Sequence, residues 1–214
     1  MKKMVFFLVV LGITLSLHAQ NRIPEYRFAS GRWEFIGDRL FQNDNIARLA
    51  KVNFRVPQSG PMEYEFNIRY EGGAEDGHGG VGIHVFADTS YNDASWGCGK
   101  SYLLWLNYDE KPLSRDIPSG LSAQVYRSYT NSRMELVQSV SLGGYEQFLT
   151  AENLSNPVSF KIEVYGNTGE IRIYDPTDEG QYYQVTANSR DVPLRGEWVT
   201  LRTNGLKASF GMGL

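Results

Sequence analysis

Hydrophobic and polar residues alternate with a period of two along much of this 214-residue chain. The alternation is clearest over residues 62–70, where single polar residues separate Met62, Tyr64, Phe66, Ile68 and Tyr70. Successive side chains of a β-strand point to opposite faces of a sheet, so this pattern predicts a strand with one buried face. The 3.6-residue period of an amphipathic helix is almost absent from the chain.

Similar runs recur along the sequence, and segments rich in glycine, proline and polar residues separate them. One short helix is expected at 145–152. Strands are expected at 32–36, 39–43, 46–54, 62–70, 80–88, 100–108, 121–128, 133–140, 157–165, 169–174, 181–186, 197–203 and 207–212.

About a dozen short strands with no long linker between them predict a single all-β domain. The best strands combine one apolar face with one polar face, which antiparallel sheets tolerate and parallel sheets generally do not. We therefore expect an antiparallel sandwich or barrel. It would span residues 20–214, which follow an N-terminal leader of 19 residues.

Two motifs, Trp33–Phe35 and Gly37–Asp44, stand at the start of this region, and three more, Val158–Val164, Gly169–Ile173 and Gly196–Arg202, stand at its end. Together these motifs resemble laminin-G-like members of the concanavalin A-like lectin/glucanase superfamily, and the last three resemble its closing strands. The resemblance implies a jelly roll of two curved antiparallel sheets. It implies no particular activity, because one fold hosts many functions. The chain also has the general look of exported spirochaete flagellar-sheath proteins, which are β-sandwiches.

The N-terminus reads as a secretory signal. Lys2 and Lys3 precede the apolar stretch Val5–Leu17, and Leu17-His18-Ala19 fits a small-residue cleavage site. We expect residues 1–19 to be removed and the protein to be exported, to the periplasm or the cell exterior. An uncleaved N-terminal anchor is the alternative. No later segment reaches the roughly 18 apolar residues of a membrane span.

The charge balance disfavours some partners and the cysteine count excludes an internal disulfide. The chain carries 21 basic and 24 acidic residues, a net charge of −3, and loss of Lys2 and Lys3 would make it −5. This mild acidity argues against a nucleic-acid partner. Cys98 is the only cysteine, so no internal disulfide can form. It is either a buried thiol in a Gly-rich turn, the favoured interpretation, or an intermolecular bridge.

No catalytic machinery is recognisable. Glycosidases of the superfamily carry the strand pattern Glu-x-Asp-x-x-Glu, and the nearest approach here, Glu63–Ile68, has Glu65 for the aspartate and Ile68 for the last glutamate. We interpret Glu63 and Glu65 as solvated carboxylates. The segment Gly77–Gly82 matches G-x-G-x-x-G, but a strand-like run follows it rather than the helix that dinucleotide binding needs. Its glycines are expected to permit turns or close strand packing.

A metal site is not assigned. Carboxylates in a Gly-rich segment could hold calcium, but neither an EF-hand spacing nor a legume-lectin metal motif is present. We expect a simple acidic turn, with no cofactor. The residues considered as ligands are Glu75, Asp76, His78, His84 and Asp88.

A recognition surface is expected if the strands at 62–70, 80–88 and 100–108 are neighbours. Their outer faces would then share Glu65, Asn67, Arg69, His84, Phe86, Trp105, Asn107 and Asp109. Aromatic rings stack on the C–H faces of sugars, while amides and carboxylates bond to the hydroxyls. The alternative is that Phe86, Leu103 and Trp105 pack under a covering loop or against another protein. Tyr91 and Trp96, in the loop before the third strand, could rim this surface.

These features predict an exported, non-catalytic binding module whose ligand is a glycan or another envelope or filament protein, held on the concave sheet. A structural subunit of a periplasmic or extracellular assembly, such as a flagellar sheath, is the second hypothesis. A divergent glycoside hydrolase that uses Glu63 or Glu65 is the third.

Overall fold

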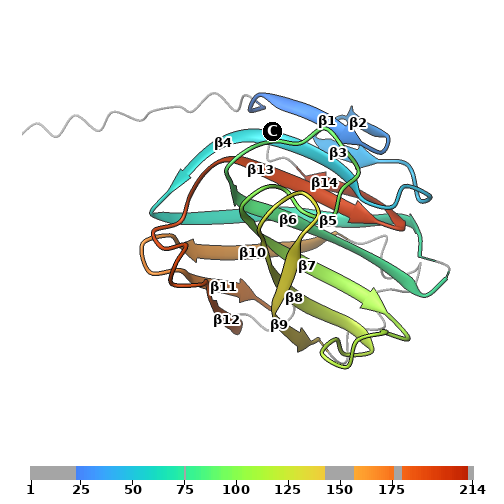
Figure 1. Cartoon of the computed structure of the whole chain (residues 1–214). Helices are drawn as coiled ribbons and strands as arrows, with labels where there is room; N and C mark the ends of the chain where they lie inside the picture. Colours follow the sequence, from blue (N-terminus) through green and yellow to red (C-terminus); the bar gives the residue numbers. More distant parts are fainter. Residues whose placement is uncertain (1–22, 75, 143–156, 176–179, 212–214) are drawn as a thin grey trace, which may run out of the picture.

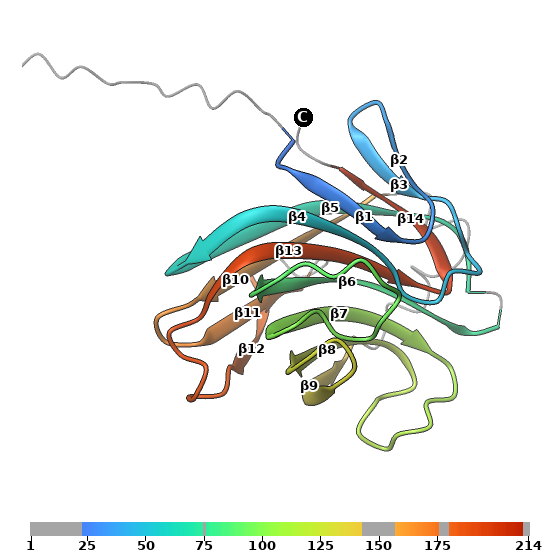
Figure 2. The same ribbon diagram turned by 45° about the horizontal axis from the view of Figure 1, so that its top comes forward.

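The computed structural model describes residues 23–74, 76–142, 157–175 and 180–211, which form an all-β sandwich. Figures 1 and 2 show two sheets packed face to face. Every strand pairing in both sheets is antiparallel. No helix long and apolar enough to cross a membrane occurs within the described ranges.

Each sheet contains seven strands in the part of the chain that the structure describes. Sheet A has the order β1 (Tyr26–Ser30), β4 (Ala50–Ser59), β13 (Arg195–Asn204), β6 (His78–Ala87), β7 (Ser101–Asp109), β8 (Gly120–Ser128) and β9 (Met134–Ser141). Sheet B has the order β12 (Tyr182–Thr186), β11 (Glu170–Tyr174), β10 (Val158–Tyr165), β5 (Pro61–Gly73), β14 (Leu206–Gly211), β3 (Arg39–Gln42) and β2 (Trp33–Ile36).

All of the strands expected from the alternation are present, with shifts at their ends. The largest shift is in β4, which begins at Ala50 rather than 46 because a turn precedes it. There the Asp44 carboxylate accepts hydrogen bonds from the Ile46 and Ala47 amides, and Leu49 adopts a φ of 72°. The sequence did not predict β1, an edge strand that leaves Tyr26 and Phe28 exposed. The expected helix at 145–152 and the signal at 1–19 lie outside the described residues.

Neighbours in the sequence are often not neighbours in a sheet. The last two strands, β13 and β14, lie in opposite sheets, with Gly205 at a φ of 67° in the turn between them. Likewise β5 lies in sheet B, whereas β6 and β7 pair in sheet A. The expectation that the strands at 62–70, 80–88 and 100–108 lie side by side is therefore wrong for the first of the three.

The two-residue alternation correctly selects the side chains between the sheets. On the four best strands the buried core includes Tyr64, Ile83, Val85, Tyr102, Leu104, Phe160, Ile162 and Val164, and Met62, Ile68, Tyr70, Val81 and Leu106 pack against it. With no disulfide available, burial of this apolar surface supplies the main driving force for folding.

The outer face of sheet A is also buried. Residues 88–100, here called the strap, connect β6 to β7 and pass across this face (Figures 1 and 2, green). Beneath the strap, Trp105 lies over glycines of the neighbouring strand. A Cβ atom on Gly80 would come within 2.3 Å of the indole, and one on Gly82 within 2.8 Å. The G-x-G-x-x-G segment therefore serves close strand packing, and Gly77 in the preceding turn has a φ of 77°.

This packing makes Gly80 more sensitive than a glycine with open space around it. We expect Gly80→Ala to lower the free energy of unfolding by about 3 kcal/mol through overpacking against Trp105. Gly37→Ala is the control, because its Cβ meets nothing within 4 Å and only its positive φ of 61° costs energy, about 1 kcal/mol. Chemical denaturation of both variants checks this, and equal losses would contradict it.

Candidate functional site

The strap covers the surface that the sequence singled out. Trp105 points away from the inter-sheet core, as predicted, but only 7% of it is exposed. Leu103 and His84 on the same face are buried as well. The covering-loop interpretation is therefore confirmed for Trp105 and Leu103, and an open recognition surface on this face is not present.

Side chains from sheet A hold the strap through its backbone carbonyl groups. Lys51 Nζ donates to the Gly97 carbonyl at 2.7 Å, and Arg202 Nη1 donates to the Trp96 carbonyl, also at 2.7 Å. Asn53 Nδ2 donates to the Tyr91 carbonyl at 3.0 Å. These bonds tie the strap to β4 and β13, and the Gly97 carbonyl also accepts from Ser95 Oγ at 3.4 Å.

Arg202 is sandwiched between two indole rings. Its guanidinium carbon lies 5.2 Å from the centroid of Trp96 in the strap and 4.9 Å from that of Trp105 in β7. Cation–π attraction of this kind strengthens when the cation is desolvated. Arg202 is only 2% exposed, and burial lowers its pKa to about 10. It forms no ion pair with a described residue.

Two further ionisable groups, His84 beneath the strap and Cys98 within it, are held in their neutral forms. Burial drives the pKa of His84 well below its usual value, and the charges of Arg202 and Lys51 lower it further. Its Nδ1 lies 3.0 Å from Ser101 Oγ. Burial also raises the pKa of the Cys98 thiol, which contacts Thr200 Oγ1 at 3.3 Å. The buried-thiol interpretation of Cys98 is confirmed.

The remaining predicted site residues do not share one surface. On β5 in sheet B, Glu65 is exposed, Asn67 accepts a hydrogen bond from Arg39, and Arg69 pairs with Glu71 at 2.6 Å. Asn107 accepts from the Trp105 indole at 3.0 Å, and Asp109 pairs with His78 at 2.9 Å. The eight predicted residues are thus divided between opposite sheets, which corrects their expected juxtaposition.

Phe86 was expected on the outer face but belongs to the core. The register between β13 and β6 shifts between Trp198 and Thr200, and Phe86 adopts a φ of 54°. Its amide donates to Gln58 Oε1 at 2.8 Å. A bulge interrupts the two-residue alternation, so residues beyond it change faces.

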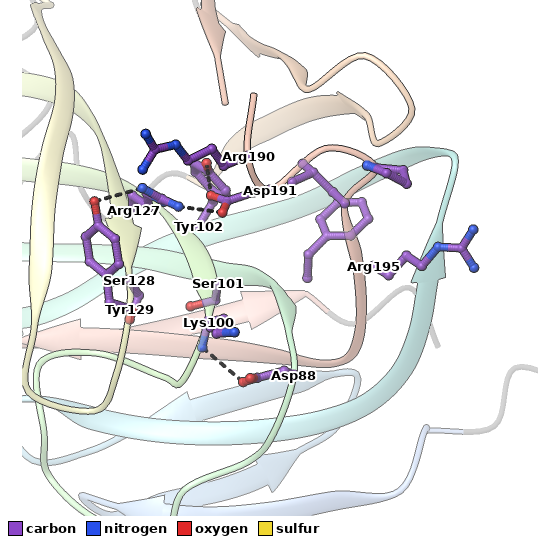
Figure 3. A pocket seen from close by; sticks show the side chains of 13 residues that line it. Asp88, Lys100, Ser101, Tyr102, Arg127, Ser128, Tyr129, Arg190, Asp191 and Arg195 are labelled. Atoms are coloured by element: carbon purple, nitrogen blue, oxygen red, sulfur yellow. Dashed lines mark hydrogen bonds and ion pairs between the residues drawn. The ribbon is translucent and has the colours of Figure 1, made fainter. Parts of the chain in front are cut away.

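A cavity of about 500 Å³ opens at one end of the sandwich, where the strap leaves and rejoins sheet A (Figure 3). We call it the end pocket. Asp88 and Lys100, the two ends of the strap, are joined there by a hydrogen bond from the Lys100 amide to the Asp88 carboxylate at 3.0 Å. The end pocket is lined by Phe86, Asp88, Lys100, Ser101, Tyr102, Arg127, Ser128, Tyr129, Arg190, Asp191, Pro193, Leu194 and Arg195.

A network of hydrogen bonds organises one wall of the end pocket (Figure 3). The Asp191 carboxylate pairs with Arg127 and accepts from the Tyr102 hydroxyl at 2.7 Å. Arg127 also donates to the Tyr129 hydroxyl at 2.8 Å, and its guanidinium lies 4.4 Å from the centroid of that ring. Burial and the hydrogen bond to Asp191 raise the pKa of Tyr102, so its hydroxyl stays protonated. The side chains of the wall are therefore preorganised by contacts with one another.

Sequence reasoning missed this pocket, although one signal was available. Ala123 and Val125 on β8 are buried, and Arg127 follows them in the same two-residue register. An arginine at such a position, at the end of a strand, must find a partner or reach the rim of the core. Its partner, Asp191, comes from the connection between β12 and β13, which the alternation could not place beside β8.

Within the described ranges, the other candidate chemistries do not assemble into a site. Glu63 is exposed on sheet B and pairs with Lys161 at 3.1 Å, and Glu65 is also exposed, so the interpretation as solvated carboxylates is confirmed. Of the residues considered for calcium, Glu75 lies outside the described part of the chain. The described histidine, cysteine, aspartate and glutamate residues include no group of three or more that could hold a metal.

Comparison with solved structures identifies the fold. A Bacillus subtilis protein of unknown function with a galectin-like fold gives a TM-score of 0.55 at 13% identity, covering 91% of this chain and 90% of that chain. The legume lectin-like domain from Entamoeba histolytica gives 0.53 at 13% identity, covering 86% and 85%. The Emp47p carbohydrate recognition domain gives 0.51 at 14% identity, covering 87% of each.

These similarities show a two-sheet, concanavalin A-like sandwich, as the sequence predicted. Similarity at such low identity establishes the fold alone. No protein-family model matches the sequence, and a comparison with curated proteins finds no match. The weaker resemblance to flagellar-sheath proteins therefore gains no support.

Burial of Lys51 under the strap predicts a pH-dependent stability. Its pKa falls from 10.5 to about 8, mainly through desolvation, so the folded state binds this proton less well than the unfolded state. Stability from this group should rise between about pH 8 and pH 10.5, by up to ~3 kcal/mol. Thermal unfolding of the unaltered protein and of Lys51→Met should be measured between pH 7 and pH 10. The difference between their free energies of unfolding at each pH gives the contribution of Lys51. Parallel pH profiles would contradict the assignment.

The contacts of Arg202 predict that it holds the strap in place. In Arg202→Met, the carbonyl bond and both indole contacts are lost, so amide hydrogen exchange over residues 91–98 should accelerate at least tenfold. Exchange in β10 and β11 should not change. Arg115→Met removes an exposed arginine and should leave the strap protected. Unchanged exchange of the strap in Arg202→Met would show that other contacts suffice.

Proposed function

We propose that this protein is an exported, non-catalytic, lectin-like module that binds a glycan in the end pocket. The observation that carries the proposal is the preorganised wall in which Tyr129, Arg127 and Asp191 hold one another beside an open cavity. The volume of the end pocket, about 500 Å³, falls within the usual range of small-molecule sites.

The chemistry of the end pocket suits a sugar. Pro193 and the Tyr129 ring give the end pocket apolar lining for the C–H groups of a pyranose, and the exposed Asp88 carboxylate and Lys100 ammonium can bond to its hydroxyls. The fold supports the same proposal, since the Entamoeba domain is described as legume lectin-like and the Emp47p domain as a carbohydrate recognition domain. Export rests on residues 1–19 alone.

A protein-contact role is the second candidate, and a different surface favours it. Tyr26 and Phe28 of β1 and Ile36 of β2 are 41%, 44% and 52% exposed, and the rings of Tyr26 and Phe28 cluster with Phe35. Both strands lie at sheet edges, where unpaired backbone groups can also bond to a partner. This surface is separate from the end pocket, so the two roles can be tested independently.

A glycan array followed by calorimetry tests the glycan proposal. Tyr129→Ala should weaken binding of any glycan hit at least tenfold, because a ring that lines the end pocket and a hydrogen-bond partner of Arg127 are lost. Tyr182→Ala is the control, since it removes an exposed tyrosine from sheet B. Absence of any hit, or equal affinity of Tyr129→Ala and the unaltered protein, would overturn the assignment of the end pocket. A Phe28→Ser variant that dissociates a complex would instead favour the protein-contact role.

A further inference from the structure

We infer that the end pocket selects acidic glycans, whose sugars carry a carboxylate or a sulfate ester. This inference rests on the proposed function and specifies the ligand class of the same site. It begins from the charges that line the cavity. Four lining residues are cationic, namely Lys100, Arg127, Arg190 and Arg195, and two are anionic, namely Asp88 and Asp191.

The charges in the end pocket are not balanced within it. Asp191 is already committed, because it pairs with Arg127 and accepts from the Tyr102 hydroxyl. Asp88 accepts from the backbone amide of Lys100, which carries no charge. Counting all six groups leaves a net charge of +2 in the cavity, whereas the whole chain has a net charge of −3. The end pocket is therefore positively charged, whereas the chain as a whole is negatively charged.

Three of these cations are free to meet a ligand. Lys100, Arg190 and Arg195 are exposed, and none forms an ion pair with a described residue. They belong to different elements, namely the end of the strap, the connection between β12 and β13, and the start of β13, and Figure 3 shows the Arg190 and Arg195 guanidinium groups on opposite sides of the pocket. Hydrogen bonds within that connection, such as the Arg190 amide to Asn188 Oδ1 at 3.0 Å, fix the backbone that carries Arg190.

This arrangement fits an anionic sugar better than a neutral one. Arginine binds carboxylate and sulfate oxygens in a planar, bidentate manner, and such charge-assisted bonds are stronger than bonds between neutral groups. A neutral sugar would leave the three exposed cations paired only with water. Tyr129 and Pro193 would still supply apolar lining for the sugar, so the acidic group adds selectivity to a site that recognises sugars generally.

Matched pairs of ligands test the inference by titration calorimetry. The carboxylate arm compares oligogalacturonate with its neutral methyl ester, and the sulfate arm compares dextran sulfate with dextran. In at least one arm the acidic member should bind at least tenfold more tightly at 50 mM salt. That advantage should shrink at 300 mM salt, because screening weakens partly exposed charges.

Charge-neutralising variants locate the effect. The triple variant Lys100→Gln, Arg190→Gln, Arg195→Gln should lose the preference for the acidic member. The triple variant Lys111→Gln, Arg48→Gln, Arg115→Gln makes the same change of charge at exposed positions outside the end pocket and should keep it. If both triple variants lose the preference equally, the effect belongs to the overall charge and the inference fails.

The outcomes separate the inference from the proposed function. One outcome would retain the proposed function and overturn the inference. In it, the neutral members, or neutral glycans on the array, bind at least as tightly as the acidic ones, and this binding is lost in Tyr129→Ala. Absence of binding to every glycan tested would overturn both. An acidic preference that only the pocket triple variant removes supports both.

Discussion

The structure depends on how two buried cations are accommodated on the outer face of sheet A. Lys51 and Arg202 are fully or almost fully buried there, and neither is paired with a carboxylate among the described residues. Such groups are costly to remove from water. The compensation comes from carbonyl dipoles of the strap and, for Arg202, from two indole faces. The cations therefore fasten the strap, and the strap keeps water from the cations.

Because of this mutual dependence, the outer face of sheet A is covered and the open pocket lies at the end of the sandwich. Because the strap lies on β4, β13 and β7, the aromatic ring that best resembled a sugar platform, Trp105, is used for internal packing. Glycines at positions 80 and 82 leave room for that ring. The cavity that stays open begins where the strap joins the sheet at Asp88 and Lys100. The covering of one surface and the construction of the other are thus parts of a single arrangement.

Charges are paired on the outer face of sheet B but are left unbalanced in the end pocket. On the outer face of sheet B, opposite charges lie next to one another, as in the contacts of Lys161 with Glu63 and Glu163 and of Arg172 with Glu170. Exposed pairs of this kind contribute little net stability, but they leave little charge uncompensated. The end pocket lacks this balance for Lys100, Arg190 and Arg195. That contrast is the physical basis for assigning recognition to the end of the sandwich rather than to either sheet face.

The sequence by itself determined the strands and the faces that pack between the sheets, because two-residue alternation and breaking residues are local properties. It correctly indicated an all-β sandwich, a buried Cys98 and glycines that serve packing. It could not assign strands to sheets, since pairing depends on contacts between distant segments, and so β5 was placed beside β6. It also missed the bulge that turns Phe86 inward. Only the tertiary structure laid the strap over Trp105 and brought Arg127 and Asp191 together, because both arrangements depend on residues far apart along the chain: Lys51 and Gly97 are separated by 46 positions, and Arg127 and Asp191 by 64.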